Sequence, residues 1–236
     1  MALPKLNTPV HVLELPSTGE EIKFRPFLVK EQKLLMLAQE SEDDKQIFEA
    51  MTTIIKSCTF DRVDTETSPL FDIEYIFLKL RAKSVGEKAK LRLLCPDDEK
   101  TYVNKEIDLD KIQIQMTEGH TNITNITDKI KIVMKYPRLS DMRNVEQMGL
   151  NTVTQAFTIL KHCIWEVHDG EKVYNRVDIS DKDIEEFIDS FDTTQLEKVM
   201  SFFETMPKLR HITKIKNPKT KVESEITIEG LQSFLG

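Results

Sequence analysis

The sequence predicts an α+β protein: an N-terminal helical layer packs with antiparallel β-hairpins, and a helical C-terminal half is closed by a second β-hairpin. Three observations lead to this prediction. Apolar residues recur with helical spacing over residues 71–86. They alternate with polar residues over residues 88–109, on both sides of a turn. Helical spacing returns over residues 140–163, and a further alternating pair of segments, residues 211–228, closes the chain.

Composition is typical of a globular protein. Of 236 residues, 39% are hydrophobic and 31% are charged, which is enough for a sizeable core and argues against long disorder. The net charge of −7 argues against nonspecific binding to nucleic acid. No run of about 18 apolar residues predicts a membrane span, and the first residues lack the apolar core of a signal peptide. We therefore expect no nucleic-acid or membrane partner, and a protein that stays in the cytoplasm where it is made.

The N-terminal segment begins with a predicted hairpin and continues with two helices. Residues 8–25 form two strands around a turn at residues 16–19. Pro26 cannot donate to a central strand ladder, so the second strand ends there. A helix to about Gln39 and a second helix over residues 44–57 follow.

The predicted helix at residues 71–86 organises the rest of the chain. Pro69 precedes it, and Gly86 stands where a left-handed residue would end it. We expect both halves of the chain to pack on this helix. The residues expected to hold the fold together are Ile76, Phe77 and Leu80.

The chain divides at Pro137, which closes the last strand of a mostly β middle section. The first predicted domain, residues 1–137, is α+β and contains the hairpin 88–109. The second, residues 138–236, is mainly helical, although Asp169-Gly170 predicts one tight turn within it. It ends in the hairpin 211–228 and a short amphipathic segment.

Two hairpin tips have the form of incomplete zinc knuckles. A zinc ribbon needs two pairs of ligands, usually thiolates, at two tight turns. The first tip offers only Cys95, with Asp98 in the second position, and the other tip has Asn217 and Thr220. We therefore expect ordinary turns, no metal and no cofactor. The three cysteines are odd in number and far apart, so no disulfide framework is expected either.

The sequence contains no recognisable set of catalytic residues. His162 and Cys163 are adjacent, so on a helix their side chains diverge. The acidic residues 181–186 lie where helix N-terminal carboxylates offset the helix dipole. We expect no catalytic residues, with a small metal-dependent hydrolase that uses scattered acids as an alternative.

Basic and apolar residues supply candidate partner contacts. Basic residues gather at the end of the helix 71–86 and along the last hairpin, where they form either a solvated face or an electropositive patch for an acidic protein. The amphipathic end of the chain either contacts a partner or packs on its own domain. The candidate contacts are Arg81, Lys83, Lys214, Lys216, Leu231, Phe234 and Leu235.

Several segments together resemble the baseplate proteins of T-even-type bacteriophages, of the kind assigned to the hub or its assembly. The segments that carry this resemblance are Phe24–Glu31, Phe71–Gly86, Glu106–Leu109, Met134–Pro137, Phe202–Pro207 and Ile228–Phe234. The resemblance implies a structural or assembly subunit of a contractile-tailed phage, made in the host cytoplasm and placed in the tail baseplate. Its partners would be other baseplate and tail proteins.

The resemblance leaves two roles open and transfers no catalytic residue. The chain is either a component of the hub or a dedicated assembly chaperone that is absent from the mature virion. Members of the family often carry Cys-Pro-x-Cys at the hairpin tips. This sequence departs from that pattern at Asp98, Asn217 and Thr220.

Overall fold

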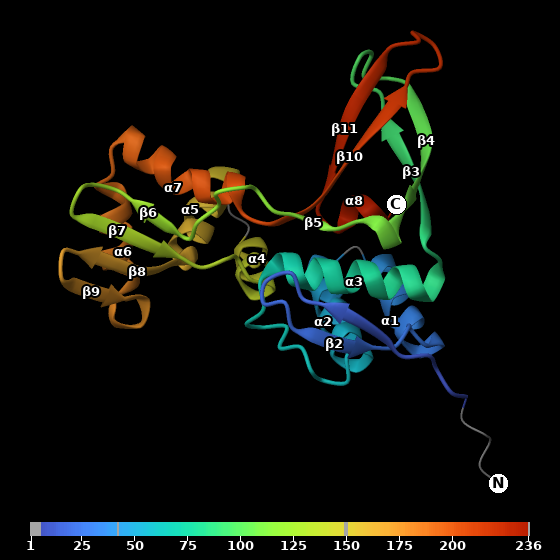
Figure 1. Ribbon diagram of the computed structural model, residues 1–236, viewed down its shortest axis with the longest axis horizontal. Coiled ribbons are helices and arrows are strands. Elements are labelled where there is room, and N and C mark those ends of the chain that lie inside the picture. The colour runs from blue at the N-terminus through green and yellow to red at the C-terminus, as the bar shows by residue number, and fades with distance from the viewer. Residues whose placement is uncertain (1–5, 42, 149–150, 236) are drawn as a thin grey trace. The chain divides into compact units, whose positions relative to one another are not determined.

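The computed structural model describes residues 6–41, 43–148 and 151–235 (Figure 1). The chain divides into two compact units. The discontinuous unit consists of the residues up to Gln115 together with those from Lys208 onward, and the inserted unit is Met116–Pro207. The expected boundary at residue 137 therefore falls inside the inserted unit.

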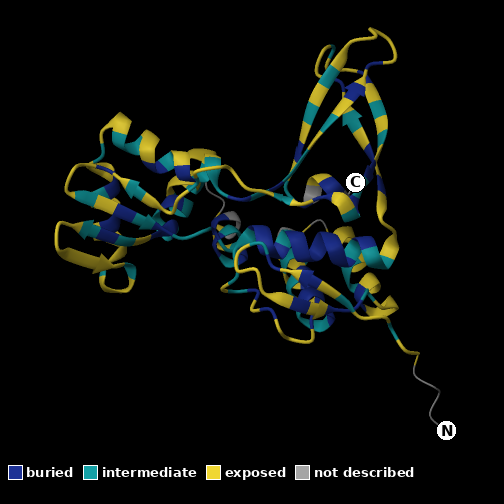
Figure 2. Cartoon of the chain, viewed as in Figure 1, coloured by how far each residue is buried: buried dark blue, intermediate teal, exposed yellow. Residues whose placement is uncertain are grey.

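Helix α3 (Leu70–Val85) lies at the centre of the discontinuous unit. Pro69 precedes it, and Gly86 ends it with a φ of 141°, a backbone conformation that favours glycine. Ile76, Phe77 and Leu80 are completely buried, which confirms them as core residues, and Figure 2 shows most of the helix in the colour of buried residues. Each such side chain contributes about 1.5–3 kcal/mol through burial.

A hairpin and two helices precede α3. Strands β1 (His11–Glu14) and β2 (Glu21–Phe24) pair antiparallel, and helices α1 (Val29–Glu40) and α2 (Asp44–Cys58) follow. The carboxylate of Asp72 in α3, which is buried, accepts hydrogen bonds from the backbone N–H and the hydroxyl of Ser17. These bonds fasten the β1–β2 turn to α3.

A buried ion pair joins β2, α1 and α2. Arg25 Nη2 lies 2.8 Å from Glu31 Oε1, and the Ser57 hydroxyl donates to the same carboxylate at 3.0 Å. Burial alone would raise the pKa of Glu31, but these bonds and one from the backbone N–H of Leu28 outweigh it and lower the pKa to about 2. The pair is thus charged at neutral pH, and both side chains form further hydrogen bonds.

The discontinuous unit is completed by strands from both of its chain segments. Strands β3 (Lys88–Leu94) and β4 (Tyr102–Asp108) form one hairpin, followed by the 3₁₀ turn η1 (Leu109–Lys111). Strands β10 (Lys208–Lys216) and β11 (Glu223–Glu229) form another, and β10 also pairs with β5 (Ile114–Gln115). Helix α8 (Gln232–Leu235) ends the described chain.

The inserted unit contains a four-stranded antiparallel sheet. Its strand order is β6 (Ile123–Asn125), β7 (Ile130–Met134), β8 (Ile164–Asp169) and β9 (Lys172–Asn175). The helices are α4 (Leu139–Gln147), α5 (Thr152–Cys163), α6 (Asp181–Asp189) and α7 (Thr193–Thr205), and the 3₁₀ turn η2 (Arg176–Asp178) precedes α6. The core includes Ile132, Met134, Leu160, Ile164, Ile184, Val199 and Phe202.

The predicted fold layout is wrong in its second half. It placed a helical C-terminal half after the strands and closed that half with a hairpin. Instead, β7 pairs with β8, with Ile132 opposite Val167, so a sheet lies among these helices. The terminal hairpin belongs to the discontinuous unit. Both errors have one cause: alternation predicts a strand but not which distant strand it pairs with.

Candidate protein-contact surface

Two hairpins of the discontinuous unit, β3–β4 and β10–β11, lie side by side with their tips at the same end (Figure 1). We call them the paired hairpins. Each of the four strands buries an apolar side chain at an alternating position: Leu91 in β3, Ile107 in β4, Ile215 in β10 and Ile228 in β11. Lys105 Nζ also donates to the carbonyl oxygen of Lys214 at 3.2 Å. The period of two thus buries one face of each hairpin and exposes the other.

The two tips fold into the same kind of turn. In the first, the N–H of Glu99 donates to the carbonyl of Cys95 at 3.0 Å; in the second, the N–H of Lys221 donates to that of Asn217 at 3.0 Å. Glu99 and Lys221 have positive φ values of 51° and 68°. Each turn starts with a residue followed by proline, which restricts the backbone in the same way at both tips.

A hydrogen-bond junction connects the tips. The Asp97 carboxylate accepts two bonds from Asn217 Nδ2, at 3.1 and 3.0 Å, and a further bond from the Thr220 hydroxyl. Asn217 is only 1% exposed, and its Oδ1 accepts the N–H of Lys219 at 2.8 Å. This buried amide is therefore satisfied at both ends, as buried polar groups require.

The tip junction includes the positions at which a zinc knuckle would need its metal ligands. Cys95 is buried, and burial together with Asp97 and Asp98 raises the pKa of its thiol. Asp98 instead accepts hydrogen bonds from the N–H and hydroxyl of Thr101. Within the described ranges, no three His, Cys, Asp or Glu side chains are grouped so that they could hold a metal ion.

The basic run on β10 faces glutamates on β11. In the strand register Lys214 lies opposite Glu225, with 3.6 Å between Nζ and Oε1, and Lys216 lies opposite Glu223. Arg210 pairs with Glu229 at 2.6 Å. Every second residue of a strand lies on the same face. The basic residues of β10 therefore lie opposite the glutamates of β11 on that face, and Lys214 and Lys216 stay candidate partner contacts.

The outer face of β3–β4 has a different character. The Arg92 guanidinium lies over the Tyr102 ring, 4.2 Å from its centroid, and Leu94 lies opposite Tyr102 in the register. Leu94 and Tyr102 are 40% and 48% exposed. Arg92 lies opposite Asn104, and no carboxylate of the described chain lies within 4 Å of it. We call Arg92, Leu94 and Tyr102 the Arg92 patch.

The sequence offered a signal for the Arg92 patch that residue type alone does not show. Positions 92 and 94 are two apart on one strand, and the register places 104 and 102 opposite them. All four therefore share one face. When Arg92 is grouped only with the other basic residues, its two apolar neighbours, Leu94 and Tyr102, are overlooked.

Of the predicted contacts at the end of α3, Lys83 forms ion pairs within its own unit. Lys83 Nζ lies 2.7 Å from Glu87 and 3.1 Å from Asp110, and these carboxylates raise its pKa. Arg81 is half-buried, and burial lowers its pKa. Neither residue stands as a freely exposed cation.

Two of the three predicted contacts at the C-terminus lie in the core. Leu231 and Phe234 are 4% and 0% exposed, in agreement with the alternative that this segment packs on its own unit. The Leu231 N–H donates to Glu74 Oε1 at 3.0 Å. Burial raises the pKa of that carboxyl to about 7, although this hydrogen bond lowers it. The side chain of Leu235 lies outside the described residues.

Comparison with protein families decides where the chain belongs. The model of a family described as T4 bacteriophage base plate protein matches residues 8–236, which is nearly the whole chain. The chain belongs to this T4 base plate family. The match confirms the resemblance seen in the sequence, and it includes both the discontinuous and the inserted unit. No curated protein and no solved structure matches the chain.

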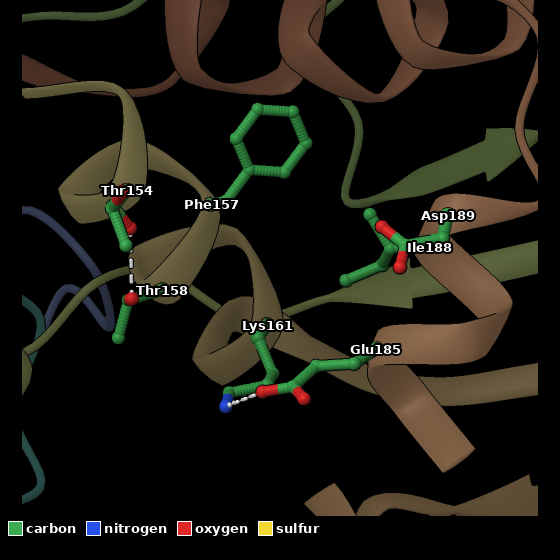
Figure 3. Close-up of a pocket in the computed structure, with 7 residues that line it drawn as sticks. All are labelled: Thr154, Phe157, Thr158, Lys161, Glu185, Ile188 and Asp189. Carbon is green, nitrogen blue, oxygen red and sulfur yellow. Dashed lines mark hydrogen bonds and ion pairs between the residues drawn. The ribbon is translucent and has the colours of Figure 1, made fainter. Parts of the chain in front are cut away.

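This T4 base plate family member has a hollow of about 250 Å³ on its inserted unit, between α5 and α6 (Figure 3). Lys161 and Glu185 form an ion pair of 2.6 Å in its lining. The Thr158 hydroxyl donates to the carbonyl of Thr154, whose own hydroxyl donates to Asn151. Both hydroxyls thus donate within α5 and to its N-cap residue.

The adjacent pair His162 and Cys163 does not form a nucleophilic site in this family member. Cys163 is completely buried, and burial raises the pKa of its thiol to about 12. His162 Nδ1 lies 3.5 Å from Asp141 of α4. The thiol therefore stays protonated and packs as a small apolar side chain.

No helix of the described chain is long and apolar enough to cross a lipid bilayer.

Proposed function

We propose that the chain is a structural or assembly subunit of the hub region of a contractile-tailed phage baseplate, and that it acts through protein contacts without catalysis. The observation that carries this proposal is the match to the base plate family over residues 8–236. A match of that length includes both units, so each is part of what defines the family. Other baseplate proteins are then its partners.

The chemistry of the cysteines supports a role without turnover. Cys58 and Cys163 are completely buried, and burial raises the pKa values of their thiols to about 11 and 12. A protonated, inaccessible thiol is not a nucleophile.

The acids that suggested a hydrolase serve helix α6. Asp183 accepts the Ser180 hydroxyl, whose oxygen in turn accepts the Asp183 N–H at 3.1 Å. Asp181 pairs with Arg176, which lowers the pKa of Asp181. Both carboxylates lie in the first helical turn, where negative charge is stabilised. They therefore have a local role, and the hydrolase is not favoured.

Deletion of the gene from its phage tests the proposal. We expect the deletion to stop baseplate assembly, and the intact chain supplied from a plasmid to restore it. Electron microscopy of the lysate provides the readout. Baseplates that assemble normally without the chain would disprove the proposed role.

Mass spectrometry of purified virions then separates the two forms of the role. A hub component is expected at one or a few copies per tail. A dedicated assembly chaperone is expected in the host cytoplasm during infection and not in the virion.

A further inference from the structure

We propose that the Arg92 patch docks an acidic segment of a partner baseplate protein. A carboxylate of that segment binds the Arg92 guanidinium, and an apolar side chain beside it packs on Leu94 and Tyr102. The inference rests on the proposed function, because it gives the chemistry of one partner of a baseplate subunit.

The guanidinium of Arg92 is held in place but lacks a carboxylate. It lies 4.2 Å from the centroid of the Tyr102 ring, at a distance typical of a cation–π contact. The residue opposite it on β4 is Asn104, and the nearby Glu106 carboxylate pairs with Lys88 at 2.7 Å. A planar guanidinium with free donors matches a carboxylate in two parallel hydrogen bonds.

Apolar surface adjoins this cation. Leu94 and Tyr102 face each other across the two strands, and both keep two-fifths or more of their surface exposed. Tyrosine and arginine are enriched among the residues that contribute most to protein interfaces. The patch therefore combines one charged anchor with an apolar neighbour.

The patch lies beside the tip junction, which reduces its freedom in the unbound protein. Leu94 directly precedes Cys95, whose N–H donates to the carbonyl of Thr101 at 2.7 Å. Thr101 in turn donates its hydroxyl to Asp98. Because these bonds order both ends of the turn, little side-chain and backbone freedom is lost on binding.

Charge complementarity favours an acidic occupant at Arg92, whereas the lysines further along the same face already lie opposite Glu106 and Asp108. On the outer face of β10–β11, Lys214 and Lys216 lie opposite Glu225 and Glu223, so an incoming carboxylate meets like charges there. No carboxylate of the described chain competes for Arg92 in this way. An acidic segment is thus attracted to the Arg92 patch rather than to the run of lysines.

Photo-crosslinking in infected cells tests the proposal. The full chain carries benzoylphenylalanine in place of Asn104, beside Arg92, or in place of Glu225 as the control on the other hairpin. After irradiation, crosslinked peptides are identified by mass spectrometry. We expect position 104 to capture a peptide of a baseplate protein that is rich in Asp and Glu. Capture of basic peptides or of nucleic acid, or no more capture than at position 225, would overturn the proposal.

Substitution of the anchor completes the test. Arg92→Gln should reduce the crosslink from position 104 at least roughly tenfold, the loss expected from one charge-assisted contact. Lys23→Gln, which removes an exposed cation from the β1–β2 hairpin, should leave the crosslink unchanged. Both variants should unfold at the wild-type temperature. A crosslink that survives Arg92→Gln would refute the docking site and leave the gene-deletion result, and with it the proposed function, unaffected.

Discussion

The side-chain amide of Asn217 donates two hydrogen bonds to the carboxylate of Asp97, 120 residues earlier in the chain, at 3.1 and 3.0 Å. Asn217 is buried and Asp97 is exposed, so the bond ties an inner side chain of one tip to an outer side chain of the other. It connects the two chain segments of the discontinuous unit at the far end of the paired hairpins. Strand pairing joins the two segments at β5 and β10, but no strand ladder joins the tips, since β3–β4 and β10–β11 belong to separate sheets.

Replacing Asp97 by alanine should loosen both tips. The change leaves the buried Asn217 amide without its acceptor, which costs about 1–3 kcal/mol. Hydrogen exchange should show faster exchange of the amides of residues 217 and 219–222, while those of α3 stay protected. Asp97→Asn keeps one carbonyl acceptor and should have a smaller effect. Equal protection of the tip in all three proteins would show that the junction contributes nothing to its order.

The core position of Leu80 predicts a strong effect of a charge there. Leu80 is completely buried in α3, so Leu80→Asp should abolish soluble folding, and Leu80→Ala should cost about 2–5 kcal/mol in the free energy of unfolding. Urea denaturation of the soluble variants measures this cost. Val85→Asp changes an exposed residue of the same helix and should remain soluble. A stable Leu80→Asp protein would contradict the central role of α3.

Acid should weaken the protein through Glu31. Its pKa is about 2 in the folded protein, against a usual value of 4.5, so the unfolded chain binds this proton at a higher pH than the folded chain does. The stabilisation is complete above about pH 4.5 and is lost as the pH falls towards 2, by an amount on the order of 3 kcal/mol. Urea denaturation between pH 2 and 6 should show this loss. Glu31→Gln should start less stable at pH 6 and lose less over the same range.

Glu74 predicts the opposite pH dependence. Burial raises its pKa from 4.5 to about 7, so the folded protein holds this proton to a higher pH than the unfolded chain does. Stability is therefore lost as the pH rises from 4.5 to 7. Glu74→Gln keeps an oxygen that accepts the Leu231 N–H, and it should be more stable than the wild type at pH 8, by on the order of 1 kcal/mol, but not at pH 4. A difference that is constant with pH would refute this assignment.

Local features of the fold could be predicted from the sequence. Helix α3 was predicted because Pro69 and Gly86 bound an unbroken apolar pattern. The hairpins 88–109 and 211–228 were predicted because alternation and turn residues lie within one short stretch. The partnership between the two hairpins was not predicted. It depends on the contact of Asp97 with Asn217 and Thr220, and neither segment contains information about the other.

The surroundings of the candidate contact residues could not be predicted for the same reason, because they depend on segments that are distant in the sequence or lie across a turn. Lys214 and Lys216 have the spacing of one exposed face, and so do Glu223 and Glu225 across the turn. Considered together, the two spacings predict cross-strand pairing of lysines with glutamates. For Phe234 the sequence predicts an apolar contact. Whether it packs inward or on a partner depends on the free surface around it, which only the folded unit defines.

The pairing of Gln115 with Lys208 on β5 and β10 has a consequence for synthesis. The ribosome releases all of Met116–Pro207 between the two segments that build the discontinuous unit, which takes roughly 5–20 seconds at about 5–20 residues per second. Throughout this delay, α3 and the β3–β4 hairpin lack the strands and the C-terminal helix that finally cover them. The newly made chain therefore exposes an apolar surface before it is complete, and this surface is a natural target for the chaperones of the host.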